Sequence, residues 1–453
     1  MSENIKTDYY SQEDILLPLL AALKEEDFKA LAKLLEKQHP SDIAELLNLC
    51  EPDDRERVIA VLGDVDSEIL TYLDPEIKEQ VASLMGVTES AKAIDKLETD
   101  DAVRFVEDLP RQKREDILDE LSTEKRLEVE DSLSYPEDSA GRLANKDFVT
   151  VSKKSNVGDV IDFLRGSKDL PQDFYTIFVL DEEDRPTHFI PLSRIMRSTR
   201  DVKVKELMAK VEYPISGMVD QEEVANIFKK YNLISTPVID PEGKMIGVIT
   251  VDDITYVIEE EAKEDMLALA GLTGGSDVSS SSMSKFRGRA PWLLINLLAA
   301  ILSTFVVSNF EGVIREFVAL AALMPVVSAL SGNVGSQTLT VTVRAIASQD
   351  LTFTNYVKVL RREISASVMN GLLVGAAAFI ISFLIFDNIQ ISIIMYLAFV
   401  VTFVVGVVVG SLVPLLMHKF DYDPAVASPV FVTAATDLVS FFFFLGTATL
   451  VLL

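Results

Sequence analysis

The first part of the chain has the hydrophobic pattern of short amphipathic helices. From about residue 12 to 134, apolar residues recur three or four positions apart, as in Ile43 and Leu47. The segments 74–85 and 109–121 resemble each other, since each has a proline near its start, then charges, then an apolar face. The pattern predicts an all-α array of short, loosely repeated helices.

Between about 138 and 258 the pattern changes to short β-branched runs that alternate with helices. The runs 175–180 and 236–239 predict strands, and 222–230 predicts a helix. This layout occurs twice in tandem, so two small α/β units are expected.

The second unit contains the string STPVIDPEGKMIGVITVDDI at 235–254. It predicts a strand, a Pro-Glu-Gly turn, another strand, and a Thr and Asp at a helix start. The string resembles a CBS module. The first unit ends in HFIPLSR, where His188, Pro191 and Arg194 replace the glycine, threonine and final aspartate, so a nucleotide role is not expected there.

The last third of the chain is strongly apolar. An acidic helix at 259–269 and a Gly/Ser-rich linker at 271–282 precede it. Apolar stretches follow that are each near the about 20 residues needed to cross a bilayer. They lie at about 291–309, 313–343, 364–386, 391–417 and 424–453. The sequence therefore predicts five transmembrane helices.

Lysine and arginine residues are distributed unevenly around these spans. One group precedes the first span and another lies between the second and third, namely Lys285, Arg287 and Arg289, then Arg344, Lys358, Arg361 and Arg362. An excess of these residues marks the cytoplasmic side. We therefore expect a cytoplasmic N-terminus and an outside C-terminus. The segment MSENIKTDYY has no pattern of a cleavable signal peptide.

The net charge of -28 is concentrated in the polar part of the chain. Of the 70 acidic and 42 basic residues, eight acidic and six basic lie in 291–453, so residues 1–290 hold 62 acidic and 36 basic. Such a surface repels nucleic acid and attracts multivalent cations, although a merely solubilising surface explains the composition equally well.

Two features inside the apolar spans carry candidate chemistry. In the second span, polar and small residues interrupt the apolar helix, which predicts either a broken helix at a watery cavity or close helix packing; they are Pro325, Gly332, Asn333, Gly335 and Gln337. In the last span, Asp437 lies inside an apolar stretch. An acid at that depth indicates a functional site by default, and a structural hydrogen bond to another helix is the alternative.

Four strings together resemble the MgtE family of magnesium channels and transporters. They are HPSDIAELL (39–47), EDSAGR (137–142), the GNxGxQ string of the second span, and the DPAxxSxP string that leads to Asp437. Their order and spacing match from about residue 30 to the end. The resemblance implies an acidic, all-α superhelical N domain (1–134), α/β tandem CBS domains (135–258), a plug helix with a linker (259–284) and an α-helical bundle of five transmembrane helices (285–453).

The resemblance also implies a homodimer in the bacterial plasma membrane. Its pore would be lined by the second and fifth spans of both protomers. Asp437 of each chain would bind hydrated Mg²⁺, and Thr433 would help to line the entry. This fits the ion, because Mg²⁺ sheds water reluctantly and is usually held by few carboxylates and retained waters.

By the same resemblance, a set of acids would bind regulatory Mg²⁺ and close the pore. The set is Glu68, Asp100, Asp253, Glu261, Glu264, Asp265 and Asp423. Ions that bridge these acids would permit closure, and repulsion at low Mg²⁺ would move the plug away. Asn232 and Tyr256 stand where sensing aspartates are expected, so fewer sites are anticipated.

A nucleotide is a further candidate ligand of the CBS cleft. Thr250 and Asp253 could contact the phosphate and ribose of ATP, but Leu233 replaces the aromatic residue on which adenine would stack. The functional alternatives are an ion-coupled transporter of Mg²⁺ or another divalent cation, and a non-conducting membrane-anchored sensor. An enzyme is not expected, since no nucleophile stands beside a base and the three histidines are scattered.

Overall fold

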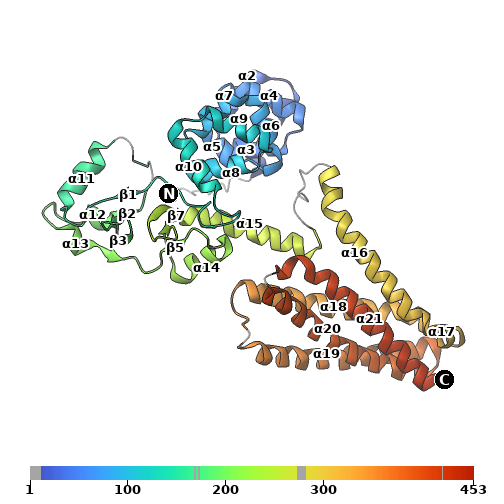
Figure 1. The fold of residues 1–453 in the computed structure, drawn as a ribbon. Helices are drawn as coiled ribbons and strands as arrows, with labels where there is room; N and C mark the ends of the chain where they lie inside the picture. Colours follow the sequence, from blue (N-terminus) through green and yellow to red (C-terminus); the bar gives the residue numbers. More distant parts are fainter. Residues whose placement is uncertain (1–11, 168–169, 172–173, 273–281, 353, 421) are drawn as a thin grey trace, which may run out of the picture. The chain divides into compact units, whose positions relative to one another are not determined.

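The computed structural model describes residues 12–167, 170–171, 174–272, 282–352, 354–420 and 422–453. The chain divides into two compact units, Met1–Glu259 and Glu260–Leu453, and each is described by itself (Figure 1). The predicted linker at 271–282 lies largely outside the described residues.

The first unit begins with the predicted array of short helices. Proline is the first residue of several of them, where its missing N–H leaves no bond unmade. The helices are α1 (Gln12–Lys24), α2 (Phe28–Leu35), α3 (Pro40–Leu49), α4 (Pro52–Leu62), α5 (Ser67–Thr71), α6 (Pro75–Met85), α7 (Val87–Ile94), α8 (Thr99–Glu107), α9 (Arg111–Glu120) and α10 (Thr123–Leu133). Their apolar faces form one continuous core, which includes the free thiol of Cys50.

Two small α/β units follow, as the sequence predicts. The first has a sheet of order β1-β2-β3-β4 and the second a sheet of order β5-β6-β7. Their elements are β1 (Val149–Thr150), α11 (Val157–Gly166), β2 (Thr176–Leu180), β3 (Pro186–Pro191), α12 (Leu192–Met196), α13 (Val204–Leu207), β4 (Ala209–Lys210), β5 (Ile215–Ser216), α14 (Gln221–Tyr231), β6 (Ser235–Ile239) and β7 (Met245–Thr250).

The two sheets share a pairing pattern. In each, a parallel pair precedes an antiparallel hairpin, and the register shifts near the end of the first hairpin strand, between Val179 and Leu180 and between Val238 and Ile239. The predicted turn of the second hairpin has Gly243 at φ +87°, a conformation that glycine adopts readily. The shared irregularity confirms the tandem repeat.

One long helix, α15 (Val251–Leu269), follows the second sheet and crosses the boundary between the two units. The second unit continues with α16 (Ser282–Ser308), α17 (Glu311–Glu316), α18 (Ala319–Ala347), α19 (Tyr356–Phe386), α20 (Ile389–Lys419) and α21 (Pro424–Leu452). Among the described residues, five of these helices are long and apolar enough to cross a membrane, and each overlaps one of the predicted spans, although some of their ends differ.

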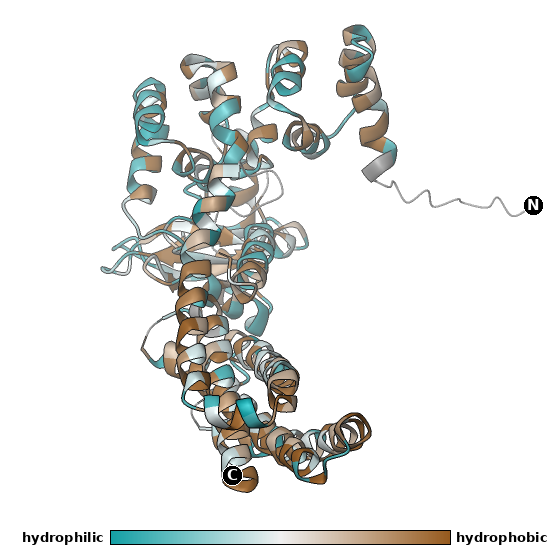
Figure 2. Cartoon of the chain, turned by 90° about the vertical axis from the view of Figure 1, so that its right-hand side faces the viewer, coloured by the Kyte–Doolittle hydropathy of each residue, from teal (hydrophilic) through white to brown (hydrophobic). Residues whose placement is uncertain are grey.

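The membrane unit is built around α20, which packs against α18, α19 and α21. Half of its most apolar window is buried, the largest share among the candidate spans of the described chain. Figure 2 shows the helices of this unit as mostly hydrophobic, whereas the helices of the N domain alternate in colour. The second predicted span is shorter than expected, because the backbone leaves the helical conformation at Phe317, between α17 and α18.

The prediction of a broken helix in the second span is wrong, since α18 runs unbroken from Ala319 to Ala347. Its small residues allow close helix packing instead, as the alternative held. A Cβ atom at Gly335 would lie 2.9 Å from Val432 and 3.1 Å from Thr436, and one at Gly410 would lie 2.5 Å from the Gly335 carbonyl. Glycine is therefore required where α18, α20 and α21 meet.

Candidate functional site

The acid of the last span lies inside the membrane bundle. Asp437 is half-buried on α21, and the hydroxyl of Ser328 on α18 donates a hydrogen bond to its Oδ1. No lysine or arginine among the described residues forms an ion pair with it. Thr433, one turn earlier, is exposed on the protomer, and its hydroxyl donates to the Pro429 carbonyl at 2.9 Å. Sequence reasoning found Asp437 but not Ser328, which no local pattern marks.

Two of the expected sensing acids lie close together in the second unit. Asp423 caps the N-terminus of α21, where its Oδ1 accepts the Ala425 amide at 2.7 Å. Burial raises the pKa of Asp265 on α15, and the charge of Asp423 raises it further. Ala268, one turn after Asp265, belongs to an apolar cluster with α18 and α21 residues. Glu261 and Glu264 lie on the same helix, the first partly buried and the second exposed.

A second group of acids gathers where α8 meets the start of α15. Asp100 is only 4% exposed, and within the described residues its Oδ1 atom is buried without a hydrogen-bond partner. Burial raises the pKa of Asp100 well above its ordinary value, and the charge of Asp253 adds to the effect. Two buried carboxyl groups whose charges act on each other cannot both ionise freely unless a cation compensates them. The structure therefore brings together two of the predicted sensing residues, one from each domain of the first unit.

An acidic cleft of about 960 Å³ lies beside this pair. Glu68 and Asp101 line it together with other carboxylates, namely Asp66, Asp95, Glu98, Glu124, Glu128 and Asp147. Lys96 and Lys125 are the cations in its lining. Burial raises the pKa of Glu98 to about 7, with nearby carboxylates adding to the shift. The local sequence pattern does not indicate that any of these additional acids lies near Glu68.

These carboxylates do not form a complete metal site within one protomer. Across the described ranges, no group of three or more histidine, cysteine, aspartate or glutamate side chains is arranged to hold a metal ion. A bound Mg²⁺ would therefore rely on retained waters for much of its shell, which is its usual mode of binding.

The two residues named for a nucleotide contact each other. The Thr250 amide donates to Asp253 Oδ2 at 3.1 Å, and its hydroxyl donates to Oδ2 at 2.8 Å and to Asp252 Oδ1 at 2.6 Å. Thr250 also lines a cleft of about 150 Å³ between the two CBS-like units. Leu233 packs against the core of the second CBS-like unit. Tyr175, which the sequence analysis does not select, lines the cleft and is exposed.

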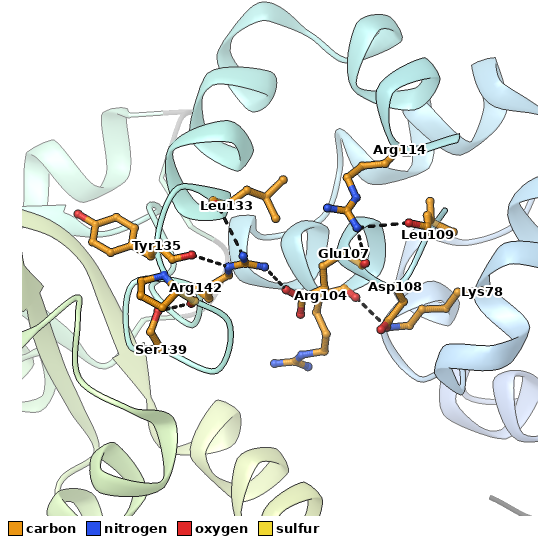
Figure 3. Close-up of polar contacts among 11 residues, drawn as sticks. Lys78, Arg104, Glu107, Asp108, Leu109, Arg114, Leu133, Tyr135, Ser139 and Arg142 are labelled. Atoms are coloured by element: carbon orange, nitrogen blue, oxygen red, sulfur yellow. Dashed lines mark hydrogen bonds and ion pairs between the residues drawn. The ribbon is translucent and has the colours of Figure 1, made fainter. Parts of the chain in front are cut away.

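Arg142 of the EDSAGR string joins the N domain to the α/β part (Figure 3). Its guanidinium donates to Glu107 Oε2 on α8 at 2.6 Å and to the Tyr135 carbonyl at 3.0 Å. The Gly141 amide bonds to the Gly217 carbonyl, and the Tyr135 ring lies where a Cβ on either glycine would be. The string therefore fixes α8, and with it Asp100, near the second CBS-like unit.

Comparison with known proteins shows which family has this architecture. Family models match residues 324–447 (MgtE, divalent cation transporter), 38–138 (MgtE intracellular N domain) and 204–260 (CBS domain). The magnesium transporter MgtE of Thermus thermophilus is 30% identical over 97% of this chain and 99% of its own length. The chain belongs to the MgtE family.

Other relatives agree with this membership. The magnesium transporter MgtE of Bacillus subtilis is 25% identical over 96% of this chain and 97% of its own length. A crystal structure of the cytosolic domain of the Mg²⁺ channel MgtE in complex with ATP is 29% identical, with a TM-score of 0.49, and covers 53% of this chain and 99% of that domain. The family models and the five apolar helices together show that this MgtE-family chain is a multi-pass membrane protein with a helical N domain and CBS domains, which confirms the predicted fold class.

Two departures from the expected MgtE pattern have structural reasons. Asn232 ends α14 in the left-handed conformation, at φ 52°, which asparagine tolerates better than most residues. Tyr256 on α15 lies under the Arg104 guanidinium of α8, whose central carbon is 4.3 Å from the ring centroid. Both positions thus have roles in the fold that do not involve a metal.

Proposed function

We propose that this protein is a Mg²⁺ channel that mediates magnesium uptake and that cytosolic Mg²⁺ closes it. The observation that carries the proposal is Asp437, a carboxylate inside an apolar span whose described partner is a neutral serine hydroxyl. A charge at that depth is costly unless water or a cation compensates it. A path for a hydrated cation provides that compensation. Membership in a family of divalent cation transporters supports the choice of ion.

The proposed pore requires two copies of the chain. Thr433 is exposed on one protomer although it lies one turn from Asp437, within a span that is mostly apolar. A homodimer with α18 and α21 at its centre would cover this surface and place one Asp437 from each chain beside the same path. Two carboxylates with retained waters match the coordination that Mg²⁺ prefers.

The proposed gate is a set of carboxylates that face one another. The charge of Asp423 acts on Asp265, and the charge of Asp253 acts on the buried Asp100. Without a cation beside them such pairs repel or must hold protons, and Mg²⁺ is one cation that can bridge them. We propose that Glu68, Glu261 and Glu264 contribute further charge. This proposal includes a division of the chain into four parts: an N domain (1–134), CBS domains (135–258), a plug with a linker (259–284) and a transmembrane domain (285–453).

The proposal places the N-terminus in the cytoplasm and the C-terminus outside a bacterial plasma membrane, since the cationic segments flank the same side of the spans. Nucleotide binding is not included. Thr250 and Asp253 already satisfy each other by hydrogen bonds, and the cleft that Thr250 lines, about 150 Å³, is small for ATP.

The test is Mg²⁺ uptake into liposomes that contain the purified protein and a Mg²⁺-sensitive dye. Asp437→Ala should reduce uptake to the level of empty liposomes. Asp387→Asn is the matched control, because Asp387 is exposed between α19 and α20 at φ 47°, where asparagine fits equally well. It should take up Mg²⁺ at the wild-type rate. Wild-type uptake by Asp437→Ala would refute the role of this residue in the pore.

A further inference from the structure

Arg104 is held between the N domain and the second CBS domain. Its guanidinium lies over the Tyr256 ring at 4.3 Å and its Nη1 is 3.4 Å from Asp101 Oδ1. The side chain is 18% exposed, and its backbone carbonyl accepts the Lys78 ammonium at 2.9 Å. Both ends of the residue are thus fixed, so the cation has a defined place at the contact of α8 with α15.

The same place holds the acids of the proposed sensor. The charges of Asp101, Asp100 and Asp253 all act on the Arg104 guanidinium. In return, the guanidinium favours the ionised forms of Asp100 and Asp101. A guanidinium stays charged throughout the physiological pH range and needs no ligand supply. These carboxylates therefore have a permanent cation among them before any Mg²⁺ arrives.

Tyr256 suits this cation and does not suit a metal ion. An aromatic face attracts a guanidinium through its quadrupole and stacks on its flat surface. Mg²⁺ takes oxygen ligands and would gain nothing from the face of the ring. The aspartate that the family resemblance leads one to expect at this position would instead add a metal ligand. Arginine over tyrosine is thus a consistent pair, which joins α8 to α15 without an ion.

We propose that Arg104 is a built-in cation that replaces one regulatory Mg²⁺ at the contact between the N domain and the second CBS domain. This contact then persists at low Mg²⁺, and Mg²⁺ is needed only for the remaining acidic surfaces. The gating consequence rests on the proposed function. The persistence of the contact does not, since it follows from the position of the cation alone.

Hydrogen exchange of the full-length protein tests the contact directly. The observed amides are those of α8 and the first turns of α15, measured in EDTA and over a Mg²⁺ titration. Arg104→Gln removes the charge, and Tyr256→Leu independently removes the ring, while Tyr256→Phe keeps the face on which the guanidinium lies. In EDTA we expect exchange in the first two variants to be about tenfold faster than in wild type, with Tyr256→Phe close to wild type.

Mg²⁺ should slow amide exchange in Arg104→Gln. The Mg²⁺ concentration at which half of this slowing is reached should be several times higher than the corresponding concentration for any slowing seen in wild type. Amides of α1 to α4 should exchange alike in all variants, which separates a lost contact from a misfolded domain. If Arg104→Gln fails this control, Tyr256→Leu still decides. Exchange in EDTA that is equal in wild type and the variants would overturn the proposal.

The consequence for gating is tested by measuring the internal Mg²⁺ concentration that halves the current. Arg104→Gln should raise this concentration, because one cation has been removed from the closed state. If wild-type current does not respond to internal Mg²⁺ at all, the proposed gate fails, whereas the exchange result for the Arg104 contact stands or falls separately. An unchanged half-closing concentration in a variant with a weakened contact would reject the link between Arg104 and gating.

Discussion

Ser328 on α18 donates a hydrogen bond to Asp437 on α21, although 109 residues separate the two in the sequence. The bond fixes the carboxylate at the junction of the helices that the proposed pore would use. It also supplies the strongest competing explanation, in which Asp437 is only a structural acceptor between two helices.

Replacing Ser328 by alanine separates the two explanations. If Asp437 binds the permeating ion, Ser328→Ala should keep growth rescue of a magnesium-uptake-deficient bacterium within about tenfold of wild type, since one neutral hydrogen bond contributes modestly. Asp437→Asn keeps hydrogen bonding but removes the charge, and should lose most of the rescue. A structural acceptor would give the opposite order, with Asp437→Asn active and Ser328→Ala impaired.

The acids of α15 should control closure and not conduction. In the triple variant Glu261→Gln, Glu264→Gln and Asp265→Asn, the closed state loses its cation bridges, while the bundle that holds Asp437 is unchanged. Current should persist at internal Mg²⁺ levels that shut the wild type. Removing the same charge from exposed acids of α4 and α9, namely Asp53, Glu56 and Glu120, should leave closure normal. A triple variant that reaches the membrane but conducts nothing would place these residues in the permeation path.

The acidic cleft should make the effect of Mg²⁺ depend on pH. The pKa of Glu98 rises from 4.5 to about 7 in the folded protein, so the folded state holds a proton that the unfolded state releases between these values. Without Mg²⁺, this contribution to stability is present below pH 4.5 and is lost as the pH rises through about 7. Mg²⁺ competes with that proton, so its stabilising effect should be larger near pH 8 than near pH 6.

Thermal unfolding of the full chain measures this, with Na⁺ at matched ionic strength as the screening control. Glu98→Gln cannot titrate and should flatten the pH dependence. Equal stabilisation by Mg²⁺ and Na⁺ at both pH values would reduce the effect to screening, and a larger Mg²⁺ effect at the lower pH would contradict the sign.

The proposed orientation of the membrane unit can be tested at its C-terminus. A reporter enzyme that works only outside the cytoplasm should be active when fused after Leu453. The same reporter fused near Asn355, in the connection between α18 and α19, should be inactive, because Arg344, Lys358, Arg361 and Arg362 hold that connection inside. The reverse pattern would contradict the orientation.

The helices, strands and spans follow from local pattern, so the sequence predicts them well. The helical periodicity of apolar residues predicts the N domain, and the turn at Gly243 predicts the second hairpin. The length of the apolar stretches predicts the five spans. Small residues were ambiguous, because Gly335 has the same local signal whether it breaks a helix or lets another helix approach. Only the packing against Val432 and Thr436 decides between the two.

Partners across the fold were beyond local pattern. Asp437 was predicted because an acid in an apolar run is locally anomalous, whereas Ser328 in an apolar helix is not. Arg104 and Tyr256 likewise lie far apart in the sequence and carry no motif, and their pairing depends on how α8 meets α15. Asn232 stands where the family resemblance leads one to expect a metal ligand, and its left-handed backbone gives a structural reason for asparagine at that position.

Patch-clamp recording of the purified protein in liposomes, with Mg²⁺ varied separately on each face, tests the central claim most directly. A channel that internal Mg²⁺ closes should show discrete unitary currents carried by Mg²⁺ from the outer face. Raising Mg²⁺ on the inner face alone should lower the open probability, whereas the unitary current should fall only as far as the smaller Mg²⁺ gradient requires. Transport without unitary currents would contradict the channel and indicate a coupled carrier. Currents indifferent to inner Mg²⁺ would contradict the gate.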